Sequence, residues 1–155
     1  MNKVHKGFTL IELLVVILII SILSVTVFVA LNPAKRFADA RDSRRFADVD
    51  SILTAVHEYI VDNGGAVTGL GMTNGVEYQL GTSATACTSV STGCTTMAAA
   101  CLDLSTELAP YLKTIPKDPS VGTATKTGYK ITKNTNGLVT VSGCASESGE
   151  VSVSR

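Results

Sequence analysis

The sequence has no tryptophan, only two histidines and no excess of charge of either sign. Its 155 residues include 13 basic and 13 acidic side chains, and this balance argues against wholesale nucleic-acid binding. One histidine, His5, lies near the amino terminus and the other, His57, lies in a helical pattern. No Ser-His-acid constellation, catalytic pair of acids or glycine-rich phosphate loop can be assembled from this chain. The composition predicts a protein that is not an enzyme and that has no cofactor.

Large aromatic side chains are also scarce after residue 63, where neither Trp nor Phe occurs. A small core of this kind must depend on aliphatic side chains, on a helix packed against it and on disulfides. The four cysteines lie far beyond the amino-terminal apolar run, which suits an oxidising extracytoplasmic side. They are Cys87, Cys94, Cys101 and Cys144.

Four cysteines allow three pairings. We favour a short loop between Cys87 and Cys94 together with a bond between Cys101 and Cys144, and the other pairings stay open. The gaps of six residues between the first three cysteines differ from the C-x-x-C spacing of structural zinc sites, so we predict no metal site in them.

One long apolar run dominates the amino-terminal part of the chain. From Leu13 to Leu31 its only polar side chains are two serines and a threonine, and 19 helical residues span about 28 Å, enough to cross a bilayer. A secretory signal has a shorter core and a small-residue cleavage site, whereas this run has Phe28 two residues before Ala30. We therefore expect the run to be retained as a single membrane span, and a single span argues against a transporter or channel formed by one chain.

The run carries one acid, Glu12, near its start. The 15 Leu, Ile, Val and Phe residues between Leu13 and Leu31 favour insertion by about 5 to 9 kcal/mol, and one carboxylate costs on the order of 3 kcal/mol. Insertion tolerates the acid, and a positive partner at the same depth would relieve the penalty. Cleavage after Gly7 would create such a partner, the new amino terminus at Phe8. The alternative interpretation is that Glu12 lies near a helix end and that its carboxylate extends to the membrane–water interface.

Gly7, Phe8, Thr9, Leu10 and Glu12 with the following apolar run resemble the prepilin signature of type IV pilins and type II secretion pseudopilins. The resemblance implies that a prepilin peptidase cuts after Gly7 and methylates Phe8. It also implies that Glu12 pairs with the amino terminus of a neighbouring subunit during filament assembly. The implied partners are the peptidase, like subunits, an inner-membrane assembly platform and membrane lipid, with no nucleic acid for the subunit alone.

The resemblance also implies an α+β, pilin-like fold, in which the second half of a long amino-terminal helix packs against a small antiparallel sheet. We expect a single-pass membrane protein with an extracytoplasmic head, which becomes a surface pilus or pseudopilus on assembly. The predicted divisions are a leader at 1–7, a transmembrane and assembly half-helix at 8–31, an amphipathic half-helix at 32–63 and a head at 64–155 with Thr-, Ser- and Gly-rich loops and a carboxyl-terminal hairpin.

A second helical pattern follows the first and ends before Gly64 and Gly65. Asn32-Pro33 separates the two patterns, so we expect a bend or a local break there. The charged residues from Lys35 to Asp50 are read as a solvated face, or alternatively as charges that pair between neighbouring subunits. Within the helix, the spacing of four predicts the ion pairs Lys35–Asp39 and Arg44–Asp48. The apolar stripe of this second pattern consists of Phe46, Val49, Leu53, Val56 and Ile60.

The rest of the chain predicts short elements. Asn136-Gly137 predicts a hairpin between the alternating segments 129–133 and 138–142. We also expect a strand at 76–80, a helix at 102–113 whose end Pro110 makes uncertain, and a last strand at 151–153.

The passage Ile115-Pro116-Lys117-Asp118-Pro119 resembles a loop of major pseudopilins that lies near a calcium site. Ser120 and Val121 replace the residues usual there, so we interpret Asp118 as a turn residue rather than a calcium ligand.

Two function classes follow from these observations. The first is a structural subunit that polymerises through its apolar helix, in a pilus or in a secretion pseudopilus. The alternative is a membrane-tethered binding or adhesion module that does not polymerise. Replacement of Glu12 by Ala discriminates between them, because only the polymer needs that carboxylate.

Overall fold

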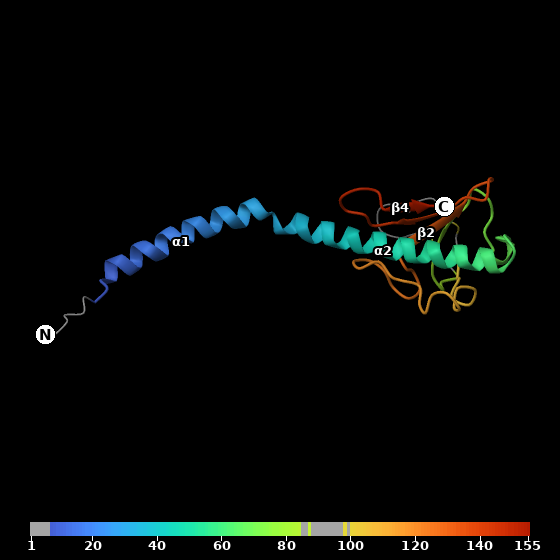
Figure 1. The fold of residues 1–155 in the computed structure, drawn as a ribbon, viewed down its shortest axis with the longest axis horizontal. Coiled ribbons are helices and arrows are strands. Elements are labelled where there is room, and N and C mark those ends of the chain that lie inside the picture. Colours follow the sequence, from blue (N-terminus) through green and yellow to red (C-terminus); the bar gives the residue numbers. More distant parts are fainter. Residues whose placement is uncertain (1–6, 85–86, 88–97, 99) are drawn as a thin grey trace. The chain divides into compact units, whose positions relative to one another are not determined.

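The computed structural model describes residues 7–84, 87, 98 and 100–155. A long amino-terminal helical region is followed by a small four-stranded antiparallel sheet, which confirms the predicted α+β, pilin-like fold class. The chain divides into two compact units, one that ends at Phe37 and one from Ala38 to Arg155 (Figure 1). The elements are α1 (Leu10–Leu31), α2 (Pro33–Asp62), the 3₁₀ helix η1 (Thr68–Leu70), β1 (Glu77–Gln79), β2 (Tyr129–Lys133), β3 (Val139–Gly143) and β4 (Ser152–Ser154).

In the first unit, Asn32 separates the two helices and confirms the predicted break. Its backbone is left-handed, with φ 40° and ψ 71°, and its N–H donates to the carbonyl of Val29 at 3.4 Å. The Asn32 side-chain oxygen accepts from the N–H of Lys35, also at 3.4 Å. Pro33 opens α2, where its missing N–H costs nothing because a first-turn donor has no helical partner. One asparagine therefore ends α1 and caps α2.

In the second unit, the strands follow the order β1-β2-β3-β4 and every neighbouring pair is antiparallel. The predicted hairpin is confirmed, with β3 one residue later than expected. Its turn is held by the Asn134 side chain, which accepts from the N–H groups of Asn136 at 3.0 Å and Leu138 at 2.8 Å. Gly137 adopts φ 85° in this turn, a conformation that glycine reaches without a steric penalty.

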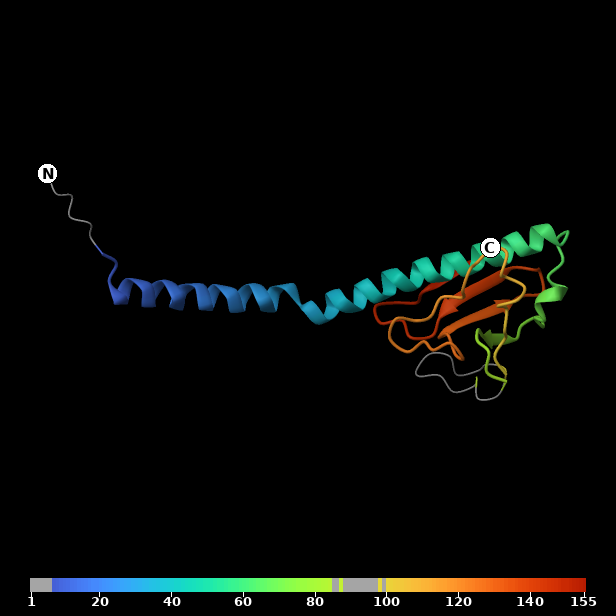
Figure 2. The same cartoon turned by 90° about the horizontal axis from the view of Figure 1, so that it is seen from below.

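The core of the second unit lies between α2 and the sheet, and Figure 2 shows α2 running along one face of the strands. Val49, Leu53 and Val56 are fully buried, as their spacing predicts. The prediction for Phe46 is wrong, because this side chain is 46% exposed, while Ile60 is half-buried against the core. The strands contribute the fully buried Tyr129, Ile131, Val139 and Val141.

Arg45 of α2 is fully buried, and it corrects our interpretation of the charged stretch as a solvated face. Its Nε and Nη2 atoms donate to the two carboxylate oxygens of Asp118 at 2.7 and 3.1 Å. Nη1 donates to Asp42 at 2.7 Å and to Glu147 at 3.1 Å. Nη2 also donates to the Ser120 hydroxyl at 2.7 Å. All five N–H groups of the guanidinium thus have partners, which is what a buried arginine requires.

This cluster joins α2 to two loops that are distant in sequence. Asp118 also accepts from the backbone N–H groups of Ser120 and Val121, so it is a turn residue, as predicted, whose carboxylate is already engaged by a cation. Asp42 accepts from the N–H groups of Glu147 and Ser148 at 2.6 to 3.1 Å. The 116–121 loop and the 143–148 loop are therefore both fixed to the same turn of α2.

The remaining charges of α2 are less constrained. The Nε atom of Arg44 lies 4.0 Å from a carboxylate oxygen of Asp48, and the Arg44 side chain is 70% exposed. This predicted ion pair is therefore long and open to solvent. The other predicted pair, Lys35 with Asp39, does not occur among the ion pairs of the described residues.

The cysteines pair differently from our expectation. Cys87 is bonded to Cys101, with 5.1 Å between their Cα atoms, so the favoured pairs Cys87–Cys94 and Cys101–Cys144 are both wrong. Cys144 is disulfide-bonded as well, and Cys94 lies outside the described residues. The backbone places Cys101 beside β1, because the N–H of Leu102 donates to the carbonyl of Gln79 at 2.8 Å.

The predicted helix at 102–113 is not formed. Single turns replace it, in which the N–H of Leu108 donates to the carbonyl of Leu104 at 3.0 Å and that of Leu112 to Leu108 at 2.8 Å. Leu104 and Leu108 still enter the core fully. The local spacing was therefore informative, but Pro110 removes a donor and prevents a continuous helix.

The Arg45 cluster predicts a large loss of stability when its cation is removed. Arg45→Met should lower the free energy of unfolding by about 3 to 5 kcal/mol, because the buried carboxylates lose their partner. Arg44→Met, at the neighbouring but exposed position, should change it by no more than about 0.5 kcal/mol. Urea unfolding of the full chain in detergent, followed by tyrosine near-UV circular dichroism, measures both values. Equal losses in the two variants would contradict the role assigned to Arg45.

The same cluster predicts loss of stability in acid. Hydrogen bonds from Arg41, at 2.5 to 2.6 Å, and from Arg45 lower the pKa of Glu147 from 4.5 to about 2. A depressed carboxylate pKa stabilises the folded state above the unfolded value, and this contribution is lost as the pH falls from 4.5 toward 2. Glu147→Gln should reduce the change in unfolding free energy across this window, whereas Glu150→Gln, an exposed acid three residues away, should leave it unchanged. Identical pH profiles for the wild type and Glu147→Gln would rule out this contribution.

Candidate functional site

The candidate site begins at Thr9, which caps the amino terminus of α1. Thr9 is extended, with φ −85° and ψ 151°, and its hydroxyl accepts from the N–H of Glu12 at 3.3 Å. In return, one carboxylate oxygen of Glu12 accepts from the Thr9 N–H at 2.8 Å and from the Thr9 hydroxyl at 2.7 Å. This reciprocal arrangement is a capping box, which satisfies donors that the first helical turn would otherwise leave free.

The capping box determines the position of the Glu12 carboxylate. It lies in the first turn of α1, where the positive end of the helix dipole favours a negative charge. The surface around it is apolar and is lined by Phe8, Ile11, Val15 and Val16. Among the residues that the structure describes, the acid is thus held by its own helix terminus and forms no ion pair.

Gly7 and Phe8 precede the helix and are accessible. The Phe8 side chain is 81% exposed, and nothing lies within 4 Å of the position that a Cβ would take at Gly7. Neither residue takes part in the capping box, which uses only atoms of Thr9 and Glu12. A cut between Gly7 and Phe8 therefore leaves the start of α1 intact.

The rest of α1 is an apolar surface without a partner in the single chain. None of the residues Leu10–Leu31, all of which the structure describes, is buried. Its three hydroxyl groups are satisfied within the helix, since Ser21, Ser24 and Thr26 donate to carbonyls three or four residues earlier at 2.7 to 2.8 Å. By length and composition this helix can cross a membrane. Internal satisfaction of its polar groups is what a lipid environment demands.

The structure places the predicted site residues in two separate groups. Gly7, Phe8 and Glu12 lie together at the start of α1, whereas Cys87, Cys101 and Cys144 belong to the second unit. Thr9 was recognised only as part of the signature, and its contact with Glu12 was not predicted. The T-x-x-E spacing before an apolar run is a recognised sign of a capping box and could have revealed it.

Comparison with known proteins agrees with this geometry. Residues 2–28 match a family described as the prokaryotic N-terminal methylation motif, which is the prepilin signature of type IV pilins and pseudopilins. No curated protein and no solved structure matches the chain. The motif supports processing by a prepilin peptidase and indicates a pilin-like subunit rather than an enzyme, and with the apolar α1 it indicates membrane anchoring.

The capping box predicts local protection of the first helical turn. Thr9→Val keeps the shape of the side chain but removes its oxygen, at a cost of about 1 kcal/mol to the helix start. Amide hydrogen exchange at Glu12 and Leu13 should accelerate about 5-fold, because 1.4 kcal/mol corresponds to roughly a factor of ten. Exchange measured by NMR on the full chain in detergent micelles tests this expectation.

Thr26→Val is the matched control for this experiment, because the Thr26 hydroxyl donates within the helix to Leu23, far from the terminus. It should leave exchange at Glu12 unchanged. Acceleration by Thr26→Val equal to that by Thr9→Val would mean that the effect is general loosening of α1.

Proposed function

We propose that this chain is the structural subunit of a filament of the type IV pilus or type II secretion class, assembled through α1. The observation that carries the proposal is a 22-residue helix without a buried side chain, whose one carboxylate lies in the first turn directly after an accessible Gly7-Phe8 bond. A helix of this kind lies in lipid before assembly and against like helices after it.

Processing is the first step of the proposal. A prepilin peptidase cuts between Gly7 and Phe8 and methylates the new amino terminus at Phe8. The cut converts a backbone amide into a cationic amine four residues before Glu12. Since the capping box does not use Gly7 or Phe8, the acid keeps its position while the partner group for a neighbouring subunit is created.

Assembly is the second step. The Glu12 carboxylate of one subunit meets the Phe8 amine of another, and two opposite charges about 4 Å apart attract by about 4 kcal/mol at an effective dielectric constant near 20. A subunit added out of register leaves both charges without a partner in an apolar bundle, which is strongly unfavourable. The pair therefore selects the stagger between subunits.

The proposed partners are the prepilin peptidase, like subunits, an inner-membrane assembly platform and membrane lipid. In this arrangement the second unit, with its disulfides, is the extracytoplasmic head. The proposal covers both filament classes, and the passage Ile115-Pro116-Lys117-Asp118-Pro119 favours the secretion pseudopilus. The competing proposal, a tethered module that does not polymerise, gives Glu12 no role beyond capping.

Glu12→Gln tests the proposal without removing the shape of the side chain. We expect the variant to be cut after Gly7 and to remain in the membrane, while filament material in the sheared surface fraction falls at least about 10-fold, because the charge pair is lost. Intact mass and amino-terminal fragmentation of both fractions give processing and assembly in one measurement.

Glu150→Gln serves as the control, since Glu150 is an exposed acid of the head. It should be processed and sheared like the wild type. Normal filament yield from Glu12→Gln, or a wild-type chain that keeps Met1, would overturn the proposal and leave the tethered module.

A further inference from the structure

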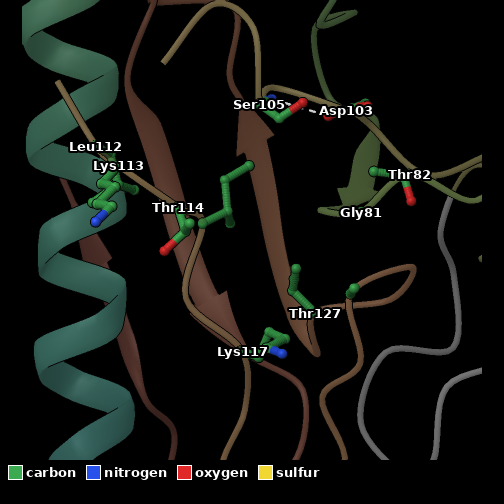
Figure 3. Close-up of a pocket in the computed structure, with 11 residues that line it drawn as sticks. Gly81, Thr82, Asp103, Ser105, Leu112, Lys113, Thr114, Lys117 and Thr127 are labelled. Atoms are coloured by element: carbon green, nitrogen blue, oxygen red, sulfur yellow. Dashed lines mark hydrogen bonds between the residues drawn. The ribbon is translucent and has the colours of Figure 1, made fainter. Parts of the chain in front are cut away.

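The head contains a preformed cavity of about 280 Å³, shown in Figure 3. Its walls come from the end of β1, the turns after residue 102 and the 112–117 and 124–127 segments. Backbone hydrogen bonds join these segments: Gly81 donates to Leu102 at 3.1 Å, Ser83 to Thr125 at 3.2 Å and Thr127 to Leu80 at 2.9 Å. Asp118, directly after the 112–117 segment, donates to Thr127 at 2.8 Å. Because the walls are fixed to one another, the cavity needs no rearrangement to admit a small molecule.

The lining of the cavity combines apolar side chains with exposed charged ones, which we call its rim. Leu112, Ile115 and Ala124 supply apolar surface, and Lys117 and Asp103 supply opposite charges. In the view of Figure 3, Lys117 lies at one end of the lining and Asp103 lies at the other, where it accepts from the Ser105 N–H at 2.9 Å. The cavity thus presents an apolar body between a cationic and an anionic end.

The cationic end is not neutralised by the protein. Lys113 and Lys117 are exposed, and neither forms an ion pair among the described residues, whereas Arg41, Arg45 and Lys130 do. The segments outside the described residues contain no Asp or Glu. Two lysines against one aspartate leave the rim with a net charge of +1, which favours an anion.

We propose that this cavity is a binding site for a compact organic anion, whose carboxylate or phosphate contacts Lys117 and whose apolar body lies on Ile115 and Leu112. Lys113, which Figure 3 shows at the edge of the lining nearest α2, adds positive potential. Asp103 repels the anion and so limits both its charge and its orientation. The site does not depend on filament assembly, because its lining belongs wholly to the second unit.

The test uses 4-hydroxybenzoate as the probe and the neutral 4-hydroxybenzamide as its isosteric control. Titration of the full chain in a neutral detergent, followed by amide NMR shifts, should give a dissociation constant of about 5 mM for a ligand of this size. The shifts should centre on residues 112–117 and 124–127. The amide should bind at least about 5-fold more weakly, and added salt should weaken only the anion.

Three variants separate the proposal from non-specific attraction. Lys117→Gln should weaken the benzoate about 5-fold, and Lys133→Gln, the same charge change outside the cavity, should leave it unchanged. Asp103→Asn should strengthen binding about 2-fold, since a repelling charge is removed while the oxygen that accepts from Ser105 remains. A gain of affinity cannot result from misfolding.

The outcomes that overturn the proposal are equally definite. They are equal binding of the benzoate and the amide, equal effects of Lys117→Gln and Lys133→Gln, or shifts that lie outside the cavity. Filament yield measured on the same variants should match the wild type, so failure here leaves the proposed assembly function untouched.

Discussion

The head of this protein depends on one buried guanidinium. Arg45 is fully buried, and its five donors reach three carboxylates and a hydroxyl from three separate segments. Burial of a cation is costly, and the cost is offset only when every donor is paired with good geometry. Asp118 and Asp42 can keep their charge in this setting, since hydrogen bonds from Arg45 and from backbone N–H groups outweigh their burial and lower the pKa of both. Each member of the cluster is therefore stable only because the others are present.

The cluster also explains how a head so poor in aromatic residues fixes its long loops. The aliphatic core lies between α2 and the sheet, and the 143–148 loop adds the buried, disulfide-bonded Cys144. That loop is held by charge as well, through Asp42 and Glu147. The ring of Tyr129 belongs to the core, and its hydroxyl donates to Asp48 of α2 at 2.7 Å. Burial together with this hydrogen bond raises the pKa of Tyr129. Ionic contacts and apolar packing thus both stabilise the head.

Sequence reasoning succeeded for most local features and failed for contacts between distant segments. The break at Asn32-Pro33 and the Asn136-Gly137 hairpin are confirmed, and so is the stripe of α2 apart from Phe46, whereas the local pattern at 102–113 did not form a helix. Arg45 carries no local sign of burial, because its main partner, Asp118, is 73 residues away. The bond between Cys87 and Cys101 likewise follows from strand-edge contacts that cysteine spacing does not encode.

Helix α1 and its capping box show the same contrast. Its apolar run and its acid could be read directly, because a membrane span and a carboxylate within it are properties of consecutive residues. The capping contact of that carboxylate with Thr9 could also be predicted from the T-x-x-E spacing, although the contact was noticed only in the structure. What sequence does not supply is the partner surface, since every side chain of α1 is exposed in the single chain.

The two halves of the protein have opposite requirements, and this contrast constrains the energetics of the proposed assembly. The head satisfies its buried charges within the Arg45 cluster, whereas α1 leaves its whole apolar surface unpaired. Glu12 is an exception within α1, because the Thr9 capping box already satisfies it. In the proposed filament, pairing with a neighbour's amine therefore exchanges hydrogen bonds and gains less than the full attraction of two free charges. The larger driving force must then come from packing of the apolar surface between helices, a contribution that is tolerant of register. In the proposed assembly the Glu12 carboxylate has the opposite property, since its partner charge is met at only one position. Its main contribution would be to fix which register the packed helices adopt.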